Sequence, residues 1–383
     1  MALVSGYRGT GSVLADRRKY DVADKLHMIS PEAAVLAVLT RKLNKKKAID
    51  PEFRWFEKEQ PSRYDAANGS FSDTDTTITV DDGTKFRAGD VITNVSSGEH
   101  MLVTAVSGND LTVTRAWGTT SAATINDNDV IVILGNANEE GAASRTSLTS
   151  QAVKKYNYTQ IFREPFAVTG TEAATELYGA KSDIVALRKE HLDIHLKDIE
   201  RAFLFGEPKE DTSGSHPRRA TGGLEYFIQT NIKDVATLTE TEFEDWLQDV
   251  FAKGNTQKLL IASPLIVSAL NSWGRGKLQL VPESKKYGLA ITEYLSAHGS
   301  LKIVEDRLLA ENSVWNGMAF CVDLAKIAYR YLSANGENRD THLRKNIQAP
   351  DYDGEKDEYL SEVGLMVIDE ASHGILKGVT SYS

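Results

Sequence analysis

The stretch KYNYTQIFREPFAVTGT, residues 155–171, lies just ahead of the longest helical pattern in the chain. It has the character of a β-strand, yet it is polar, rich in aromatic residues and interrupted by Pro165. Because proline cannot donate a backbone hydrogen bond, a strand that contains it usually lies at a sheet edge or bends there. We expect Tyr156, Tyr158 and Phe162 to alternate to one side. The stretch therefore predicts an edge strand that presents aromatic side chains to a neighbouring strand or subunit.

A long amphipathic helix is predicted over residues 182–205, directly after this strand. Ser182 is a candidate N-cap, and Gly206 and Pro208 are residue types that end helices. About 24 residues at about 1.5 Å each give a rod of about 36 Å. The expected apolar face consists of Val185, Leu192, Leu196, Ile199 and Phe203. The other faces are charged and include Glu200, so we expect one face on a core and the others on solvent or on partner chains.

Residues 72–134 have a different pattern, in which short alternating segments are separated by turns rich in Gly, Asp and Ser. The segments are TTITV, DVITNV, HMLVTAV, DLTVTRAW and DVIVIL. The expected apolar face consists of Ile78, Val80, Val91, Val103, Val106, Leu111, Val113, Ile131 and Ile133. Such alternation, with turns roughly every ten residues, predicts a small antiparallel barrel or sandwich inserted ahead of the long helix.

The N-terminal part is predicted to combine an extended arm with one helix. Residues 1–28 are rich in glycine and charge and show no clear period, which is typical of an arm. In the segment ISPEAAVLAVLTRKLNKKK, Ser30 and Pro31 suit a helix start. The helix face consists of Val35, Leu36, Leu39 and Leu43. The basic cluster at its C-terminal end comprises Arg41, Lys42, Lys45, Lys46 and Lys47. It complements the helix dipole, and a nucleic-acid contact is the alternative.

Residues 226–333 predict a compact mixed α/β domain. Thr239 and Glu242 fit a capping box at the start of one helix. Strands are predicted from KLLIA, LKIVED, MAFCVDL and KIAYRYL. A polar loop is expected before this domain, over residues 207–222, and the C-terminal segment YLSEVGLMVIDEASHGILKGV predicts two strands around a turn.

Composition limits the possible functions. The chain has 383 residues, of which 41% are hydrophobic and 26% charged, as is ordinary for a globular protein. Its apolar runs are too short to span a membrane, and its N-terminus lacks the apolar stretch of a secretory signal. We therefore expect a protein that stays in the cytoplasm where it is made. A formal net charge of −10 argues against a protein built mainly to bind nucleic acid.

Few residues have the spacing of a metal or catalytic site. His191, Asp193 and His195 place two imidazoles on one helix face, but no further cluster in the sequence completes a metal shell. Partly exposed histidines are therefore the preferred interpretation. Cys321 lies in an apolar run, which predicts a buried and unreactive thiol.

The glycine-rich segment WGRGK, residues 273–277, is a further polar candidate. Arg275 and Lys277 could bind an anion, although a loop tip is the simpler interpretation. The sequence contains no G-x-S-x-G, no P-loop and no H-E-x-x-H motif. We therefore expect no catalytic centre, no cofactor and no metal, and a function based on contact with copies of the same chain.

Four stretches together carry a resemblance to a known family. They are FRWFEKE; TTITVDDGTKFRAGDVI with GEHMLVTAV; YNYTQIFREPFAVTGTEAA with LDIHLKDIERAFLFGEP; and TGGLEYFIQTN with EVGLMVIDEASHGILKGV. In this order, over nearly the whole chain, they resemble major capsid proteins of tailed bacteriophages with the Hong Kong 97 type fold, in the subgroup typified by phage SU-ten. The resemblance implies an α+β fold with an N-terminal arm, an extended loop, a peripheral domain and an axial domain.

The resemblance also implies where these parts lie. They are residues 1–50 as the arm, 51–155 as the extended loop with the β-rich insertion at about 72–134, 156–225 as the peripheral domain with its spine helix at about 182–205, 226–335 as the axial domain, and 336–383 as the return to the peripheral domain. The implied function is a non-enzymatic subunit that assembles into hexamers and pentamers of an icosahedral head. The head encloses double-stranded DNA without sequence-specific binding and without a membrane.

Further partners implied by the resemblance are scaffold, portal and decoration proteins, with the virion capsid as location and the host cytoplasm as the place of assembly. We expect subunit contacts at Arg54, Trp55, Phe56, Tyr156, Tyr158, Phe162, Arg275 and Lys277. Two alternatives stay open. An encapsulin-like compartment would share the fold but enclose enzymes. An enzyme located in residues 226–333 would have a concave pocket with several titratable groups at strand ends.

Overall fold

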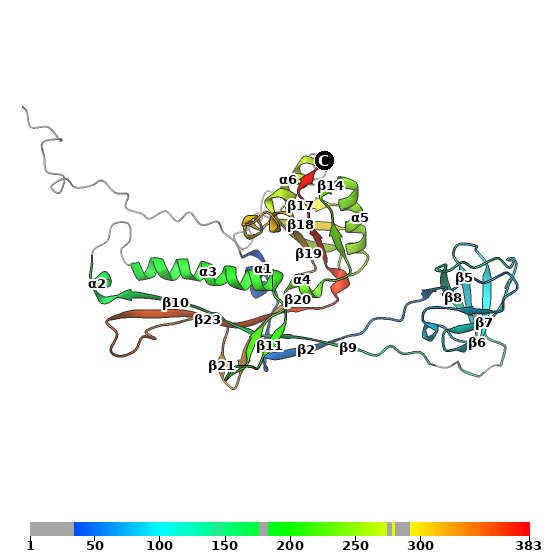
Figure 1. Ribbon diagram of the computed structural model, residues 1–383, viewed down its shortest axis with the longest axis horizontal. Helices are drawn as coiled ribbons and strands as arrows, with labels where there is room; N and C mark the ends of the chain where they lie inside the picture. The colour runs from blue at the N-terminus through cyan, green and yellow to red at the C-terminus, as the bar shows by residue number, and fades with distance from the viewer. Residues whose placement is uncertain (1–33, 142, 146, 176–182, 274–277, 280–291) are drawn as a thin grey trace, which may run out of the picture. The chain divides into compact units, whose positions relative to one another are not determined.

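The computed structural model describes residues 34–141, 143–145, 147–175, 183–273, 278–279 and 292–383 (Figure 1). Two compact units are present: a main unit, Met1–Trp55 with Lys155–Ser383, and an inserted unit, Phe56–Lys154. Several predicted features lie outside the described residues. They are the arm at 1–28, the helix-start residues Ser30 and Pro31, the N-cap Ser182, and the loop residues Arg275 and Lys277.

The first sheet of the main unit has the strand order β1-β20-β23-β10. Its strands are β1 (Lys45–Ala48), β20 (Ile327–Ala334), β23 (Gly354–Val367) and β10 (Gln160–Thr169), with β21 (Glu337–Asn338) on β20 and β22 (His342–Arg344) on β23. Only the β1–β20 pair is parallel among these described strands. β10 is an edge strand, as predicted, and Pro165 stands opposite Glu358 within an unbroken ladder to β23.

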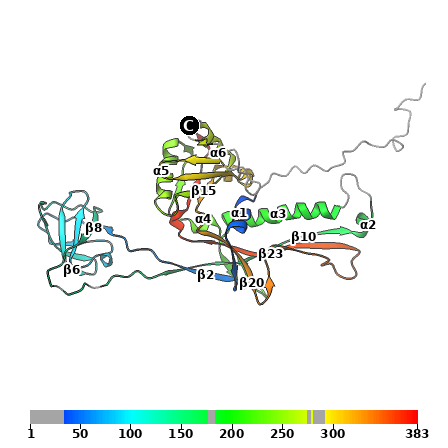
Figure 2. The same ribbon diagram turned by 180° about the vertical axis from the view of Figure 1, so that it is seen from behind.

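The helix α3 (Asp183–Phe205) runs along β10 and β23, as two opposite views show (Figure 1 and Figure 2). A single turn, α2 (Gly170–Ala173), lies between β10 and α3 in the sequence. Ile199 and Phe203 are buried, which confirms that part of the predicted apolar face. Val185 is 60% exposed, so its assignment to the core was wrong. Glu200, expected on a solvated face, is completely buried.

The helix α1 (Val35–Leu43) packs against α3 with Val35, Leu36 and Leu39 buried, as predicted. Leu43 is 49% exposed, so its place on the apolar face was wrong. The chain turns into β1 two residues after Leu43, and the lysines at positions 45–47 therefore belong to a strand and not to the helix end.

The second sheet of the main unit has the order β13-β24-β19-β15-β18-β17-β16. Its strands are β13 (Ile232–Asp234), β24 (Gly374–Lys377), β19 (Ala319–Val322), β15 (Gln257–Ala262), β18 (Ser300–Glu305), β17 (Thr292–Leu295) and β16 (Leu278–Gln279). The helices α4 (Leu224–Phe227), α5 (Glu240–Phe251) and α6 (Pro264–Trp273) belong to this part. The predicted capping box of α5 is present, with Thr239 and Glu242 bonded reciprocally.

Two strands lie in a different sheet from the one that the predicted boundaries imply. β20, expected in the mixed domain at 226–335, belongs to the first sheet. β24, expected in the return to the peripheral domain, pairs with β19 and β13 in the second sheet. β23 and β24 are thus not a hairpin, and the 3-10 helix η6 (Glu370–Ser372) carries the chain from one sheet to the other.

Three short two-stranded sheets are also present among the described residues. They are β2 (Glu52–Glu57) with β9 (Val153–Tyr158), β11 (Lys209–Asp211) with β12 (Arg218–Ala220), and β14 (Thr237–Leu238) with β25 (Ser381–Tyr382). The predicted polar loop at 207–222 is therefore partly a hairpin. Its strands are joined by an ion pair of 2.8 Å between Arg219 Nε and Glu210 Oε1. Two further 3-10 helices, η4 (Arg307–Ala310) and η5 (Trp315–Gly317), follow β18.

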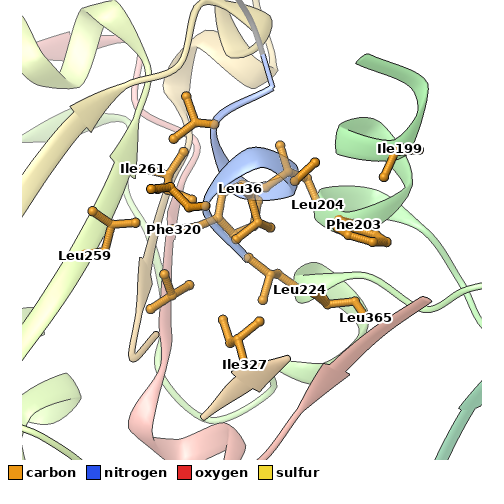
Figure 3. Close-up of a cluster of buried hydrophobic side chains, with 14 of the residues drawn as sticks. Leu36, Ile199, Phe203, Leu204, Leu224, Leu259, Ile261, Phe320, Ile327 and Leu365 are labelled. Atoms are coloured by element: carbon orange, nitrogen blue, oxygen red, sulfur yellow. The ribbon is translucent and has the colours of Figure 1, made fainter. Parts of the chain in front are cut away.

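One hydrophobic core joins both sheets of the main unit to α1 and α3 (Figure 3). Leu36, Phe203 and Leu204 meet Leu224 and Phe320 there. Burying a side chain of this kind contributes about 1.5–3 kcal/mol. The cluster spans β10, β20 and β23 of the first sheet and β15, β19 and β24 of the second, which explains why both sheets belong to one unit.

The inserted unit is an antiparallel sheet of the order β3-β8-β5-β6-β7-β4. Its elements are β3 (Tyr64–Ala66), β4 (Thr77–Thr79), the 3-10 helix η3 (Gly83–Lys85), β5 (Asp90–Asn94), β6 (His100–Ser107), β7 (Asp110–Thr114) and β8 (Val130–Asn136). A bridge between Ala67 and Val80 joins the residues that follow the two outermost strands. Closure into a barrel or sandwich stays a prediction.

Burial within the inserted unit follows the predicted alternation, with the exception of Val91. Val91 is half-buried and Ile92 is fully buried, because the register to β8 shifts between these two residues. A β-bulge reverses which side chains face inward, and this reversal makes the assignment of Val91 wrong. Val106 lies beyond a register shift between Val103 and Ala105, yet it is half-buried and packs against the core of the inserted unit, as predicted.

Candidate assembly surface

The strand β2 carries three of the predicted contact residues, divided between its two faces. Trp55 is 6% exposed and packs 5.8 Å from the Phe227 ring, next to Phe53. Phe56 is 71% exposed, and Arg54 is exposed with its Nε 2.6 Å from Glu52 Oε1. Because successive side chains of a strand alternate, Arg54 and Phe56 are available to a partner while Trp55 belongs to the core of the chain itself.

The strand β9 presents an aromatic pair. Tyr156 is 43% exposed and Tyr158 is half-buried, and their rings meet edge to face with centroids 5.7 Å apart. Burial raises the pKa of Tyr158, with Glu52 and Glu210 contributing. Tyrosines combine a large apolar ring with a polar end, and such residues are enriched where proteins meet each other.

Phe162 does not share the face of these tyrosines. It is 7% exposed and belongs to the main core, whereas its neighbour Ile161 is 51% exposed. β9 ends at Tyr158 and β10 begins at Gln160, so the alternation changes phase at Thr159. The expectation that Tyr156, Tyr158 and Phe162 point to one side is therefore wrong.

Asn157 holds the chain at this change of phase. It is completely buried, and its Nδ2 donates to Leu365 O at 2.6 Å, Gly222 O at 3.0 Å and Thr221 Oγ1 at 3.2 Å. Its Oδ1 accepts from the backbone N–H of Gly222 at 2.7 Å and of Tyr158 at 2.8 Å. Buried polar groups are costly unless they are paired, so this residue fixes β9 against β23 and the segment before α4.

Both histidines of the candidate metal motif on α3 contact side chains of the first sheet. His191 Nδ1 lies 2.7 Å from Glu164 Oε1, and His195 Nε2 lies 2.6 Å from Ser361 Oγ. Burial lowers the pKa of His195 to about 4, so the ring is neutral near pH 7. Within the described residues, no group of three or more His, Cys, Asp or Glu side chains is arranged to hold a metal ion.

A cavity of about 380 Å³ lies at the start of β15, in the region of the enzyme alternative. Lys258, in its lining, donates from Nζ to the carbonyls of Val250, Lys253 and Ser372, and burial lowers its pKa. Asp323, also in the lining, accepts hydrogen bonds from Asn255. Both charged groups thus hold backbone segments together. Cys321 is buried as predicted, and burial raises the pKa of its thiol to about 12.

The comparisons with known proteins decide the class. A family model described as SU10 major capsid protein matches residues 6–380, nearly the whole chain. The chain belongs to the SU10 major capsid protein family. The family match favours the capsid prediction over the encapsulin-like alternative.

Two further proteins are similar to this SU10 family member. The major capsid protein of Pseudomonas phage PaMx41 is 28% identical over 271 residues, which make up 67% of the chain and 65% of that relative. The chain thus matches just under two thirds of the relative's length. The solved structure of Gordonia phage Cozz has 11% identity and a TM-score of 0.50, with 99% of this chain and 98% of that chain covered.

A third likeness is to the holo-SrpI encapsulin complex from Synechococcus elongatus PCC 7942, with 12% identity and a TM-score of 0.44 over 61% of this chain and 80% of that one. The fold of this SU10 family member is the predicted Hong Kong 97 type capsid fold. Among its described residues, no helix is long and apolar enough to cross a membrane.

Sequence reasoning missed two buried polar residues of this SU10 family member. Asn157 had no signal beyond its place between two tyrosines. Glu200 had one: it lies four residues from both Leu196 and Leu204, at the spacing of a single helix face. The predicted contact residues Arg275 and Lys277 lie outside the described residues.

Proposed function

We propose that the chain is the structural subunit of an icosahedral bacteriophage head that assembles as hexamers and pentamers around double-stranded DNA. The observation that carries this proposal is the match of the SU10 major capsid protein family to residues 6–380. The proposal includes the virion capsid as location and assembly in the host cytoplasm. Scaffold, portal and decoration proteins are its proposed further partners.

The proposed subunit contacts are Arg54, Phe56, Tyr156 and Tyr158, together with Arg275 and Lys277. The first four lie on β2 and β9, and Phe56 with its 71% exposure is the strongest candidate. An aromatic side chain this open to water can serve as an anchor when a partner covers it. Trp55 and Phe162 are buried within the chain itself, so they would affect contacts only by holding β2 and β10 in place.

The division into parts remains a proposal as well. The first sheet with α3 would form most of the peripheral domain, and the second sheet the axial domain. Residues 1–50 would form the arm, and residues 51–155 the extended loop. A net charge of −10 is consistent with a shell whose surface does not adhere to packaged DNA. A role without catalysis is supported by the structural bonds of Lys258 and Asp323 beside the cavity.

Electron microscopy of the purified full chain tests the proposal. We expect closed shells or separate hexamers and pentamers, and a stable monomer at high concentration would overturn it. Nuclease treatment of shells formed during infection separates the head from a compartment. Double-stranded DNA protected inside the shell agrees with a phage head, whereas protected enzyme cargo without DNA would favour the encapsulin-like alternative.

A further inference from the structure

The N-terminus of α1 is capped by a residue far away in the sequence. Ala34 occupies the N-cap position, with φ at 134°, and has no side chain that could accept a hydrogen bond. Glu200 of α3 caps the helix instead. Its Oε1 accepts from Leu36 N at 2.7 Å and its Oε2 accepts from Ala37 N at 2.6 Å. These are the second and third residues of the helix, whose N–H groups have no partner within a helix.

The Glu200 carboxyl group is shut away from water. It is completely buried, and both its bonding partner Leu36 and its neighbour in the sequence, Ile199, belong to the main hydrophobic core. An ionised carboxylate in such a setting loses its hydration free energy. Its hydrogen bonds to the two N–H groups offset only part of this loss.

A second buried carboxyl group acts on Glu200. Asp306, the N-cap of η4, is completely buried, and its Oδ1 accepts from Leu308 N at 2.9 Å. Its Oδ2 is buried without a hydrogen-bond partner among the described residues. Burial, and then the charge of Asp306, raise the pKa of Glu200 to about 8. Burial raises the pKa of Asp306 to about 6.

Among the described residues, Asp306 is the one charged group that acts on the pKa of Glu200. From α1, the groups that face Glu200 are uncharged N–H groups, and its basic residues Arg41 and Lys42 lie in the last turn. Beyond η4, Glu311 acts on Asp306 and is itself paired with Arg201 at 2.9 Å. The Glu200–Asp306 pair therefore sets the electrostatics under the start of α1.

We propose that Glu200 acts as a pH-dependent switch for the docking of α1 on α3. Docked α1 covers Glu200 beside Asp306, whereas undocking exposes the carboxyl group to water. Exposure returns the pKa of Glu200 to its ordinary value of 4.5, far below the value in the docked state. Docking therefore binds a proton. It is strongest below about pH 4.5 and weakens as the pH rises toward 8. This inference goes beyond shell assembly and does not depend on it.

Amide hydrogen exchange of α1 in the full-length protein tests the switch. Protection factors, corrected for the intrinsic pH dependence of exchange, are measured on the wild type and on Glu200→Gln. Glu190→Gln serves as control, because Glu190 is an exposed carboxyl group on the same helix. We expect protection in the wild type and the control to fall by up to about tenfold per pH unit between about pH 5 and 8. Protection in Glu200→Gln should stay level. A level wild type, or a Glu200→Gln variant that falls in parallel with it, would overturn the proposal.

Two further measurements test the pH-dependent switch if Glu200→Gln does not fold. In Asp306→Asn the neighbouring charge is gone, so the loss of α1 protection should level out at a lower pH than in the wild type. Infrared difference spectra of the wild type should show a carboxylic-acid carbonyl band that disappears as the pH rises through about 8. The absence of such a band at neutral pH, or an unchanged profile in Asp306→Asn, contradicts a protonated Glu200.

Discussion

The side-chain amide of Asn157 donates a hydrogen bond to the carbonyl oxygen of Leu365, 2.6 Å away and 208 residues later in the chain. The same side chain both donates to and accepts from the backbone of Gly222. One buried residue thereby joins β9, the segment before α4 and the long strand β23. Tyr156 and Tyr158, on either side of Asn157, depend on this anchor for their position.

Replacing this anchor should cost much of the stability of the main unit. We expect Asn157→Ala to lower the free energy of unfolding by about 2–4 kcal/mol, because a buried N–H or carbonyl left unpaired costs about 1–3 kcal/mol. Urea unfolding followed by circular dichroism measures the change. Asn138→Ala, at an exposed position of the inserted unit, should stay within about 0.5 kcal/mol of the wild type. Equal effects of the two variants would show that Asn157 is not an anchor.

Adjacent residues of β10 should respond in opposite ways. Phe162 is buried in the main core, so Phe162→Ala should destabilise the fold by about 3–5 kcal/mol. Ile161 is 51% exposed, and Ile161→Ala should cost less than about 1 kcal/mol. Thermal unfolding of both variants measures the difference. A Phe162→Ala variant that unfolds like the wild type but does not assemble would restore the sequence-based expectation of a contact residue.

A buried ion pair should make the inserted unit sensitive to acid. Arg115 donates to both carboxylate oxygens of Glu99, at 2.8 and 2.7 Å, and both side chains are almost fully buried. Burial alone would raise the pKa of Glu99, but the bonds from Arg115 and from the N–H groups of Ala123 and Ala116 bring it below its ordinary value of 4.5. The pair therefore contributes stability above about pH 4.5, and this contribution is lost as the pH falls through the lowered pKa.

Hydrogen exchange of residues 99–115 in the full chain checks this prediction. In Arg115→Met, Glu99 stays buried without its partner, and we expect a loss of about 3–5 kcal/mol at neutral pH. The loss should shrink in acid, where Glu99 binds a proton and no longer needs a positive charge. A penalty that does not change with pH would mean that packing, and not the ion pair, stabilises this part of the sheet.

The exposed aromatic residues of β2 and β9 should affect assembly and leave folding unchanged. We expect Phe56→Ser and Tyr156→Ser to raise the protein concentration needed for shell formation about tenfold or more, since a central aromatic contact contributes about 2 kcal/mol or more to binding. Sedimentation and electron microscopy over a concentration series measure this threshold. Tyr352→Ser is the matched control, because Tyr352 is 47% exposed but lies on neither strand. Wild-type thresholds in both variants would remove these residues from the proposed contact surface.

Local patterns were enough to predict the elements that depend on nearby residues. The capping box of Thr239 and Glu242 and the extent of α3 follow from the first and last turns of those helices. The alternating segments at 72–134 are strands where predicted, because alternation and turn residues act over a few positions. The error at Val91 arose at a β-bulge, which is a property of two paired strands and has no marker in either one.

Some candidate contact residues could likewise be placed from local patterns, whereas others depend on partners far away in the chain. Arg54, Phe56 and Tyr156 are exposed, as a contact requires. Alternation along a single strand predicts which of its side chains share a face. Phe162 could not be placed from its spacing, because the phase change at Thr159 results from the bonds of Asn157 to Gly222 and Leu365. Trp55 is buried because Phe227, far along the chain, covers its ring.

By itself, the sequence determined the family, through a resemblance over nearly the whole chain, and the local elements, because these depend on residue types at short spacing. Only the tertiary structure decided that β20 lies in the first sheet and β24 in the second, that Glu200 caps α1, and that Phe162 faces the core. The deciding partners lie far away in the chain: Lys45 of β1 pairs with Tyr329 of β20, and Glu200 bonds to Leu36 across 164 residues. Burial and hydrogen bonding at such separations result from the packing of the whole core, which no local pattern encodes.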